Sequence, residues 1–316
     1  MYSRLLGKAV SPPVFRVVGS IAVAASALCA PLAQAEDARD HEIAARFAPV
    51  IYQETGSRPK ADAITSFDFD GDWNAYNNWE NLKHFPTPAY VYYSMIESET
   101  HYFITYGLFH PQDYTRICLP FVCHENDMEG AHLTVQKTDD GAGRVVFVET
   151  KAHGGMPKTK APFLVDGRVA LRVEKQGHGV YPMSAREHTE FQRKSNVLEY
   201  VFTGQPDDPN SARAGRFGYE LTSMFDTLWA RRTEIGRNKA YRGEYEYGGT
   251  RFDLGKIASR FGGAKWAGSV SPPWAWNGRG AKSDWFFDPA FHRRNEEGLG
   301  QPFSTDYVRN SFVHIQ

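Results

Sequence analysis

Short runs of β-branched and aromatic residues, separated by polar turns, fill the chain from about residue 50 to residue 202. Residues 89–96 (AYVYYSMI) and 102–109 (YFITYGLF), on either side of the polar turn 97–100, predict a β-hairpin. Further strands are predicted at residues 50–52, 131–136, 144–150, 163–165, 169–173 and 197–202, with a favoured type I′ turn at Asp166-Gly167. Short strands at this spacing favour a mainly β fold, an antiparallel, jelly-roll-like β-sandwich with a few peripheral helices.

Helical periodicity is confined to two segments. Residues 37–46 predict a short helix that Pro49 ends, and apolar residues at helical spacing between 221 and 229 predict an amphipathic helix over 220–234. The Pro/Asp/Asn-rich residues 205–211 are typical of a surface loop or a subdomain boundary. We therefore expect a single β-sandwich domain over residues 36–316, with a C-terminal extension of helix and loop from about residue 205.

The last sixty residues are rich in Gly, Pro and Trp and have little periodicity. Trp274 and Trp276, beside Pro272-Pro273, are the most conspicuous aromatic pair there. Such pairs usually belong to the core, and we expect that here; the alternative is a stacking platform for a glycan.

The N-terminus has the features of a secretory signal peptide. Arg4, Lys8 and Arg16 precede the apolar run 17–28, and Ala33-Gln34-Ala35 supplies the small-x-small cleavage pattern. A buried core helix would also be apolar, but it would not combine a basic flank, a short run and this ending. We expect residues 1–35 to be a signal peptide, and the mature protein to be secreted or periplasmic with no transmembrane segment.

Charge and cysteine content narrow the possible partners and the redox setting. The 316 residues carry 36 Lys+Arg and 37 Asp+Glu, a net charge of -1, so the basic surplus that binds nucleic acid is missing. Beyond the signal, Cys118 and Cys123 remain as an even pair, and an oxidising compartment predicts a disulfide between them. This bridge would shape residues 117–122, which lead directly to His124.

The densest set of chemically active residues is Cys123-His124-Glu125-Asn126-Asp127-Met128-Glu129. In an extended segment its three acids would lie on one face, where like charges repel unless a cation lies among them. Asp113 is a candidate fourth ligand across the bridged loop. A set dominated by carboxylates, with one imidazole, favours Ca²⁺, Mg²⁺ or Mn²⁺ over zinc. The alternative is a solvated acidic loop, and Met128 excludes the His-Glu-x-x-His zinc-protease motif.

This segment resembles the core motif of the necrosis- and ethylene-inducing peptide-like (NLP) proteins, secreted β-sandwich cytolysins with the heptapeptide Gly-His-Arg-His-Asp-Trp-Glu. Residues 123–129 match it at His124, Asp127 and Glu129, with Cys, Glu, Asn and Met at the other four positions. Residues 109–113 (FHPQD) resemble a family Tyr-Phe-Pro-Lys-Asp segment, and residues 152–155 (AHGG) a family Ala-His-Gly turn. The resemblance implies a divalent cation held by Asp113, His124, Asp127 and Glu129, with His153 at the rim.

Two further candidates are less specific. Residues 177–182 (GHGVYP) are similar to a signature of vacuolar protein sorting-associated-like proteins, which makes His178 a site candidate, although a lone histidine is usually structural. The resemblances together span about residues 90–182. Asp68, Asp70, Asp72 and Asn74 alternate as in the first half of a calcium loop, but the glycine and the position-twelve ligand of an EF-hand are misplaced. The alternative is an Asp/Asn-rich surface turn.

Three functional hypotheses follow. The first is an exported, cation-binding β-sandwich protein, related to NLP proteins, that recognises a membrane lipid head group or a glycan without turnover. The second is a metal-dependent hydrolase in which Glu125 or His153 acts as general base. The third is a structural calcium protein without a ligand.

Overall fold

The structure is a computed structural model, which describes residues 37–118, 123–236, 240–247, 250–264, 270–276 and 284–312. The chain divides into two compact units, Met1–Arg39 and Asp40–Gln316, and the fold below is that of the second. The expected signal peptide over residues 1–35 lies outside the described residues. In the described ranges no helix is long and apolar enough to span a membrane.

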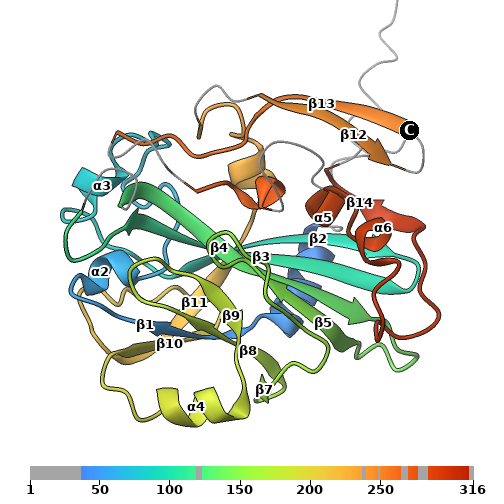
Figure 1. The fold of residues 1–316 in the computed structure, drawn as a ribbon, viewed down its shortest axis with the longest axis horizontal. Coiled ribbons are helices and arrows are strands. Elements are labelled where there is room, and N and C mark those ends of the chain that lie inside the picture. The colour runs from blue at the N-terminus through green and yellow to red at the C-terminus, as the bar shows by residue number, and fades with distance from the viewer. Residues whose placement is uncertain are drawn as a thin grey trace, which may run out of the picture. The chain divides into compact units, whose positions relative to one another are not determined.

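The chain is mainly β, as expected (Figure 1). The strands are β1 (Val50–Glu54), β2 (Tyr90–Ser98), β3 (His101–Asp113), β4 (His124–Gln136), β5 (Arg144–Thr150), β6 (Lys158–Thr159), β7 (Leu164–Val165), β8 (Arg168–Val173), β9 (Val180–Pro182), β10 (Val197–Phe202), β11 (Gly215–Ser223), β12 (Ala240–Tyr247), β13 (Thr250–Ala258) and β14 (Tyr307–Asn310). The helical segments are residues 37–47, α2 (Pro59–Asp62), α3 (Asn78–Asn81), α4 (Ala185–Phe191), the π-helical turn η1 (Phe225–Trp229), the 3-10 turn η2 (Pro273–Ala275), α5 (Asp284–Phe287) and α6 (Pro289–Arg293).

Among the described residues, twelve strands form one sheet with the order β6-β5-β4-β3-β2-β11-β10-β1-β8-β7; β14 joins β2, and β9 joins β8. The pairs β1–β8, β10–β11 and β11–β2 are parallel. The two ends of this order approach each other: the Val180 N–H of β9, which pairs with β8 near one end, donates at 3.0 Å to the carbonyl of Lys151, just after β5 near the other end. The sheet is therefore mixed and nearly closed, like a barrel. The expected purely antiparallel sandwich is replaced because local patterns carry no information on the direction of partners distant in sequence.

Both faces of the central strands are buried, which explains their continuous apolar sequence. Ile104, Tyr106 and Leu108 of β3 point to a cluster that also holds residues of β1, β8 and β10, and we call this the inner face. Phe103 and Phe109 point to the opposite, outer face, where the C-terminal segments cover the sheet. The inner face thus fills the nearly closed sheet, and the outer face needs the C-terminal segments to exclude water.

The C-terminal tryptophans belong to this outer core. Trp274 and Trp276 are 0% and 3% exposed, and their indole N–H groups donate to the carbonyls of Ala258 and Ser271. The expectation of a core role is confirmed, and a stacking platform for glycans is wrong for these two rings.

The hairpin expected between residues 89 and 109 is confirmed: β2 and β3 pair antiparallel, with Met95 opposite Ile104. The β7–β8 hairpin is also present, with positive φ at Asp166 and Gly167 as a type I′ turn requires. The amphipathic helix expected over residues 220–234 is wrong over most of its length: β11 extends to Ser223, only the π-helical turn Phe225–Trp229 is helical, and residues 230–234 form turns. Parallel pairing of β11 with β2 overrides the helical spacing there.

Candidate functional site

The candidate cation-binding motif lies within β4 itself and not in a loop before it. Strands β3 and β4 run side by side, and β4 begins at His124, seven residues before the predicted start at residue 131 (Figure 1). Asp113 at the end of β3 pairs in register with His124, and His110 pairs with Asp127. The predicted ligands therefore sit on two adjacent strands where the ladder ends.

Asn126 determines which of these side chains share a face. In a regular strand His124 and Asp127, three residues apart, would point in opposite directions. Asn126 has φ +60°, a left-handed conformation that interrupts the alternation. Burial would lower the pKa of His124, but the hydrogen bond with Asp113 and the charges of Asp127 and Asp113 raise it, so His124 lies close to Asp127 as well. The Asn126 amide is fixed by donating to the carbonyls of Ala75 and Gly262, each at 2.7 Å.

The same interruption separates Glu125 from the other acids, contrary to the expectation that it shares a face with Asp127 and Glu129. The Glu125 carboxylate is fully buried and accepts the backbone N–H groups of Trp79 (2.8 Å) and Ala264 (2.6 Å). Its role is to fix α3 and a C-terminal segment against β4. This makes Glu125 a poor general base.

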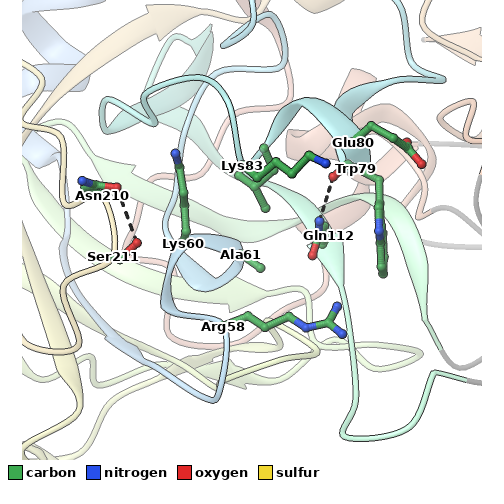
Figure 2. A pocket seen from close by; sticks show the side chains of 10 residues that line it. Arg58, Lys60, Ala61, Trp79, Glu80, Lys83, Gln112, Asn210 and Ser211 are labelled. Atoms are coloured by element: carbon green, nitrogen blue, oxygen red, sulfur yellow. Dashed lines mark hydrogen bonds between the residues drawn. The ribbon is translucent and has the colours of Figure 1, made fainter.

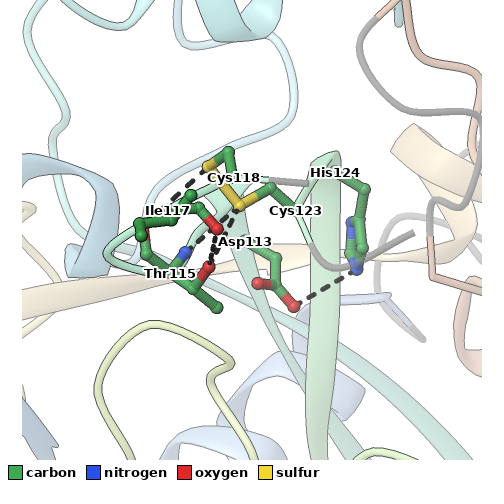
Figure 3. Close-up of a disulfide and its surroundings, with 6 residues drawn as sticks. All are labelled: Asp113, Thr115, Ile117, Cys118, Cys123 and His124. Atoms are coloured by element: carbon green, nitrogen blue, oxygen red, sulfur yellow. Dashed lines mark hydrogen bonds and ion pairs between the residues drawn. A yellow bond between two sulfur atoms is a disulfide. The ribbon is translucent and has the colours of Figure 1, made fainter. Parts of the chain in front are cut away.

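The disulfide expected between Cys118 and Cys123 is present, with a Cα–Cα distance of 5.3 Å (Figure 3). Next to it, His124 Nε2 lies 3.3 Å from Asp113 Oδ2, across the two strand ends. The bridge thus joins the end of β3 to the start of β4, and it holds these two predicted ligands beside each other.

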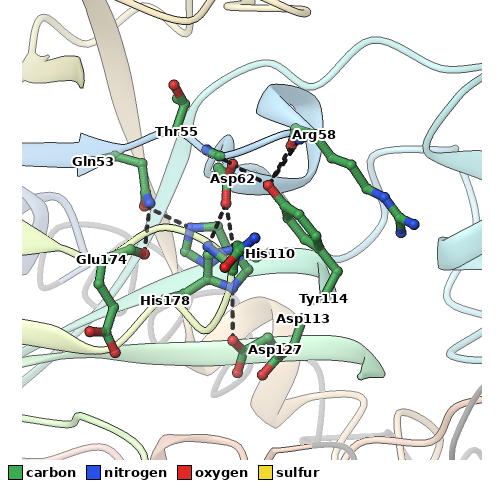
Figure 4. Close-up of polar contacts among 12 residues, drawn as sticks. Gln53, Thr55, Arg58, Asp62, His110, Asp113, Tyr114, Asp127, Glu174 and His178 are labelled. Atoms are coloured by element: carbon green, nitrogen blue, oxygen red, sulfur yellow. Dashed lines mark hydrogen bonds and ion pairs between the residues drawn. The ribbon is translucent and has the colours of Figure 1, made fainter. Parts of the chain in front are cut away.

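A buried polar cluster lies behind these ligands, at the end of the inner face (Figure 4). The His178 imidazole is fully buried between two carboxylates: Nδ1 lies 2.8 Å from Asp127 Oδ2, and Nε2 lies 3.4 Å from Asp62 Oδ1. Burial alone would lower the pKa of His178, but the hydrogen bonds and charges of both aspartates raise it to about 10. The imidazole is therefore a cation at neutral pH. His178, a weak candidate by sequence, is central to the cluster.

A second histidine, His110, also belongs to the cluster. The His110 ring stacks on His178 with centroids 3.8 Å apart and an interplanar angle of 5°, and its Nε2 lies 3.1 Å from Gln53 Oε1. Burial and the neighbouring His178 charge hold the pKa of His110 well below its usual range. One ring is thus charged and the other neutral. Asp62 is held by the N–H groups of Gly56 and Gln176, each at 2.7 Å.

Glu129 adds a third buried carboxylate next to Asp127. Burial and the Asp127 charge raise the pKa of Glu129 well above its usual range, although the His153 N–H donates to its Oε1 at 2.6 Å. Lys151 is nearby and mostly buried, and burial lowers its pKa. Three carboxylates thus share the cluster with the cations His178 and Lys151, and repulsion from Asp127 favours the protonated form of Glu129.

Three of the four predicted ligands have a polar atom without a partner among the described residues. Asp127 Oδ1, Glu129 Oε2 and His124 Nδ1 are buried and have no hydrogen-bond partner in the described part of the chain. Three of the four predicted ligands thus each have one unused polar atom, and unused buried atoms are costly. Nevertheless, no three His, Cys, Asp or Glu side chains in the described ranges converge closely enough to hold a metal ion as they stand. The donor types fit a divalent cation, and binding requires the side chains to move together.

His153 lies at the rim of the cluster. Its side chain is 53% exposed and contacts Glu174 through Nε2. A Cβ at Gly177 or Gly179 would lie 2.9 Å or 3.1 Å from this ring, so only glycine lets the His178 loop pass so closely. His153 is therefore the accessible imidazole of the site, whereas His178 and His110 are enclosed.

The second acidic segment forms a series of turns. Asp70, Asp72 and Asn74 each accept the backbone N–H two residues further along the chain, at 3.2, 2.6 and 3.1 Å. The flanking aromatic residues pack inward, with Phe67 stacked on Trp73 at 5.7 Å between centroids. The Asp70, Asp72 and Asn74 side chains thus accept hydrogen bonds from the local backbone, as in the Asp/Asn-rich surface turn. A calcium loop with Asp68 as first ligand stays a prediction.

Several members of the cluster were not found from the sequence. His110 lies inside the FHPQD segment but next to the aspartate that the resemblance singled out. Lys151 precedes the AHGG turn, and Glu174 lies four residues before His178. Asp62, in α2, has no local signal, because only the tertiary fold brings it to His178.

Comparison with known proteins gives fold neighbours only. The chain is similar to solved structures of NLP toxin-fold proteins, including one described as "Toxin fold for microbial attack and plant defense" (15% identity, TM-score 0.36, 63% of this chain and 80% of that chain). Another is "NLPPya in complex with glucosamine" (16% identity, TM-score 0.36, 63% and 79%). A third is "Necrosis and Ethylene inducing Protein 2 from the causal agent of cocoa's Witches Broom disease" (19% identity, TM-score 0.26, 47% and 57%).

No family model and no curated protein sequence matches the chain. The structures named above include no vacuolar protein sorting-associated protein, so that resemblance stays a prediction.

Proposed function

We propose that this chain is an exported protein, related to the NLP superfamily, that binds one divalent cation through Asp113, His124, Asp127 and Glu129. In this proposal the cation site recognises a membrane lipid head group or a glycan. The observation that carries it is the set of unpartnered buried atoms on Asp127, Glu129 and His124. Export rests on the predicted signal peptide over residues 1–35 and is supported by the disulfide.

Electrostatics supports a cation at this place. Asp127 and Glu129 are each 1% exposed and close enough for the charge of one to raise the pKa of the other. A divalent ion would offset that repulsion and use the free oxygens. Oxygen-dominated donor sets of this kind prefer Ca²⁺, Mg²⁺ or Mn²⁺. A bound ion would supply positive charge and open coordination positions for the oxygens of a ligand.

The first test is metal-dependent stability. We expect the mature protein to melt at a higher temperature in excess Ca²⁺, Mg²⁺ or Mn²⁺ than in chelator, since a ligand at about 100 times its Kd adds about 2.7 kcal/mol of stability. Asp127→Asn should abolish this difference, because it removes one ligand charge and retains the shape. Differential scanning calorimetry with and without each metal gives the measurement.

The matched control is Asp140→Asn, which changes a carboxylate in an exposed turn and should keep the full metal effect. Equal melting temperatures for the unmodified protein in chelator and in all three metals would contradict the proposed cation site.

Surface recognition is supported by the position of the bridged loop. Ile117, next to Cys118, is 70% exposed and can contact a surface. It lies on the same segment that joins Asp113 to His124. A head group bound at the cation would therefore bring an apolar side chain towards the same surface.

The second test measures that recognition. We expect the protein to sediment with vesicles of at least one lipid composition, or to bind at least one glycan on an array, only when metal is present. Asp127→Asn should lose the association, and Ile117→Ser should weaken it about tenfold if the loop contacts the surface. Binding that is unchanged by chelator and by both substitutions would refute a metal-organised surface.

The alternative is a metal-dependent hydrolase, and one observation favours it: His153 is half-exposed and paired with Glu174, as a general base would be. In that case metal-dependent cleavage of an ester or phosphoester substrate would be lost in His153→Gln. A substrate panel run with the same variants separates turnover from binding.

A further inference from the structure

A surface pocket is lined by residues of α2, α3 and the end of β3 (Figure 2). It has a volume of about 570 Å³, within the range of small-molecule sites. Gln112 lines it, whereas Asp113, the next residue along β3, belongs to the candidate cation site. None of the four predicted cation ligands lines this pocket, so the two sites are distinct.

The charge of this pocket is positive. Arg58, Lys60 and Lys83 line it against a single acid, Glu80. Within the described residues, none of the three cations forms an ion pair with a carboxylate; Lys60 donates to the carbonyl of Phe85 at 2.6 Å. Elsewhere in the described chain, cations such as Lys158 and Lys194 do pair with carboxylates. Three unpaired cations around one cavity attract an anion.

The most important cation is held in place by aromatic rings. The Arg58 guanidinium carbon lies 5.2 Å from the Tyr114 ring centroid and 5.9 Å from the Trp79 ring centroid. Tyr114 is in turn anchored, because its hydroxyl donates to Asp62 at 2.7 Å. A guanidinium fixed by stacking keeps its N–H groups free for a planar or tetrahedral oxyanion.

Trp79, which forms the apolar wall of the pocket, is also held in place. The Trp79 backbone donates to Glu125 Oε1 at 2.8 Å and accepts from Gln112 Nε2 at 3.0 Å, which ties the wall to both β3 and β4. Leu82 and the Trp79 ring supply an apolar surface beside the three cations. The pocket therefore combines cationic side chains with an apolar surface against which a ring can pack.

We propose that this pocket binds a phosphate or sulfate ester of a small ring compound, with Arg58, Lys60 and Lys83 on the oxyanion and the ring against Trp79. Both esters present the same tetrahedral oxyanion. The two esters differ in charge, and separate binding measurements show whether the pocket takes the phosphate ester or the sulfate ester.

The test is isothermal titration calorimetry of the mature protein with glucose 6-phosphate, glucose 6-sulfate and glucose at constant ionic strength. We expect heat from one or both esters and none from glucose. Arg58→Gln should weaken ester binding at least about tenfold, the loss of about 1.4 kcal/mol expected for one charge-assisted contact. Lys83→Gln, at an exposed position, tests the same charge if Arg58→Gln does not fold.

Two control variants test whether the loss of binding is specific to this pocket. Arg186→Gln removes an exposed cation of α4 and should leave ester binding unchanged. Asp127→Asn should also leave it unchanged, so that failure of the cation-site proposal and failure of this one are distinguishable. Equal binding of glucose and its esters, no ester binding up to about 10 mM, or full affinity in a folded Arg58→Gln, Lys83→Gln double variant would overturn the proposal.

Discussion

Replacement of Arg293 by Met is expected to lower the free energy of unfolding by about 3–5 kcal/mol, because it leaves a buried carboxylate without its counter-charge. Arg293, at the end of α6, is fully buried, and its Nη2 lies 2.7 Å from Glu149 Oε2 on β5. The indole N–H of Trp285 donates to the same oxygen at 2.6 Å. This network attaches the C-terminal helices to the outer face of the sheet.

The measurement is chemical denaturation of the unmodified protein and of Arg293→Met. Arg294→Met is the matched control: the same change, one residue later and exposed, should cost no more than about 0.5 kcal/mol. The double variant Glu149→Gln, Arg293→Met should recover part of the loss, since Gln is neutral and still accepts from Trp285. Equal stability of Arg293→Met and Arg294→Met would show that the buried pair contributes nothing.

Stability should also fall as pH rises above neutral, because His178 binds a proton more tightly in the folded protein than in the unfolded chain. Its pKa is raised to about 10 by Asp127 and Asp62, despite burial, whereas an unfolded histidine has a pKa near 6.5. The stabilisation is fully present below pH ~6.5 and is lost as pH rises towards the folded pKa. The stabilisation lost over this range is about 5 kcal/mol.

This pH dependence is measured by denaturation between pH 6.5 and 10 with chelator present, so that no metal competes for Asp127. His178→Gln should show a smaller decrease over this range than the unmodified protein, because its side chain cannot bind a proton. His84→Gln, in an exposed loop, should retain the full decrease. Parallel curves for the unmodified protein and His178→Gln would contradict a charged His178 between the two aspartates.

Local sequence patterns were sufficient for most individual strands. The apolar run 89–96 and the Asp166-Gly167 turn depend on contacts between near neighbours, and both predictions are confirmed. The disulfide is also local, since Cys118 and Cys123 are separated by five positions. The helix expected over 220–234 is reduced to the π-helical turn Phe225–Trp229, and its first residues form β11, because β2, more than 120 residues earlier in the chain, pairs with them.

In the candidate site, too, local contacts were predictable from the sequence and the directions of the side chains were not. The sequence selected Asp113, His124, Asp127 and Glu129, and their adjacency follows from a single β3–β4 pairing close in the chain. It could not assign the faces, because the left-handed backbone of Asn126 turns Glu125 away and brings His124 to Asp127. A period-two pattern assumes a regular strand, and one residue at positive φ is enough to break it.

The sequence by itself thus determined the β class, the presence of eight of the fourteen strands in the described ranges and the bridged cysteines, and it selected four candidate cation ligands. Only the tertiary structure decided the mixed, nearly closed sheet, the covering of its outer face by the C-terminal segments, and the enclosure of His178 between Asp127 and the distant Asp62. The physical reason is the distance along the chain over which each interaction acts. Turn chemistry and strand alternation act over a few residues, whereas strand direction, buried ion pairs and the balance of buried charge depend on residues that meet only when the chain has folded.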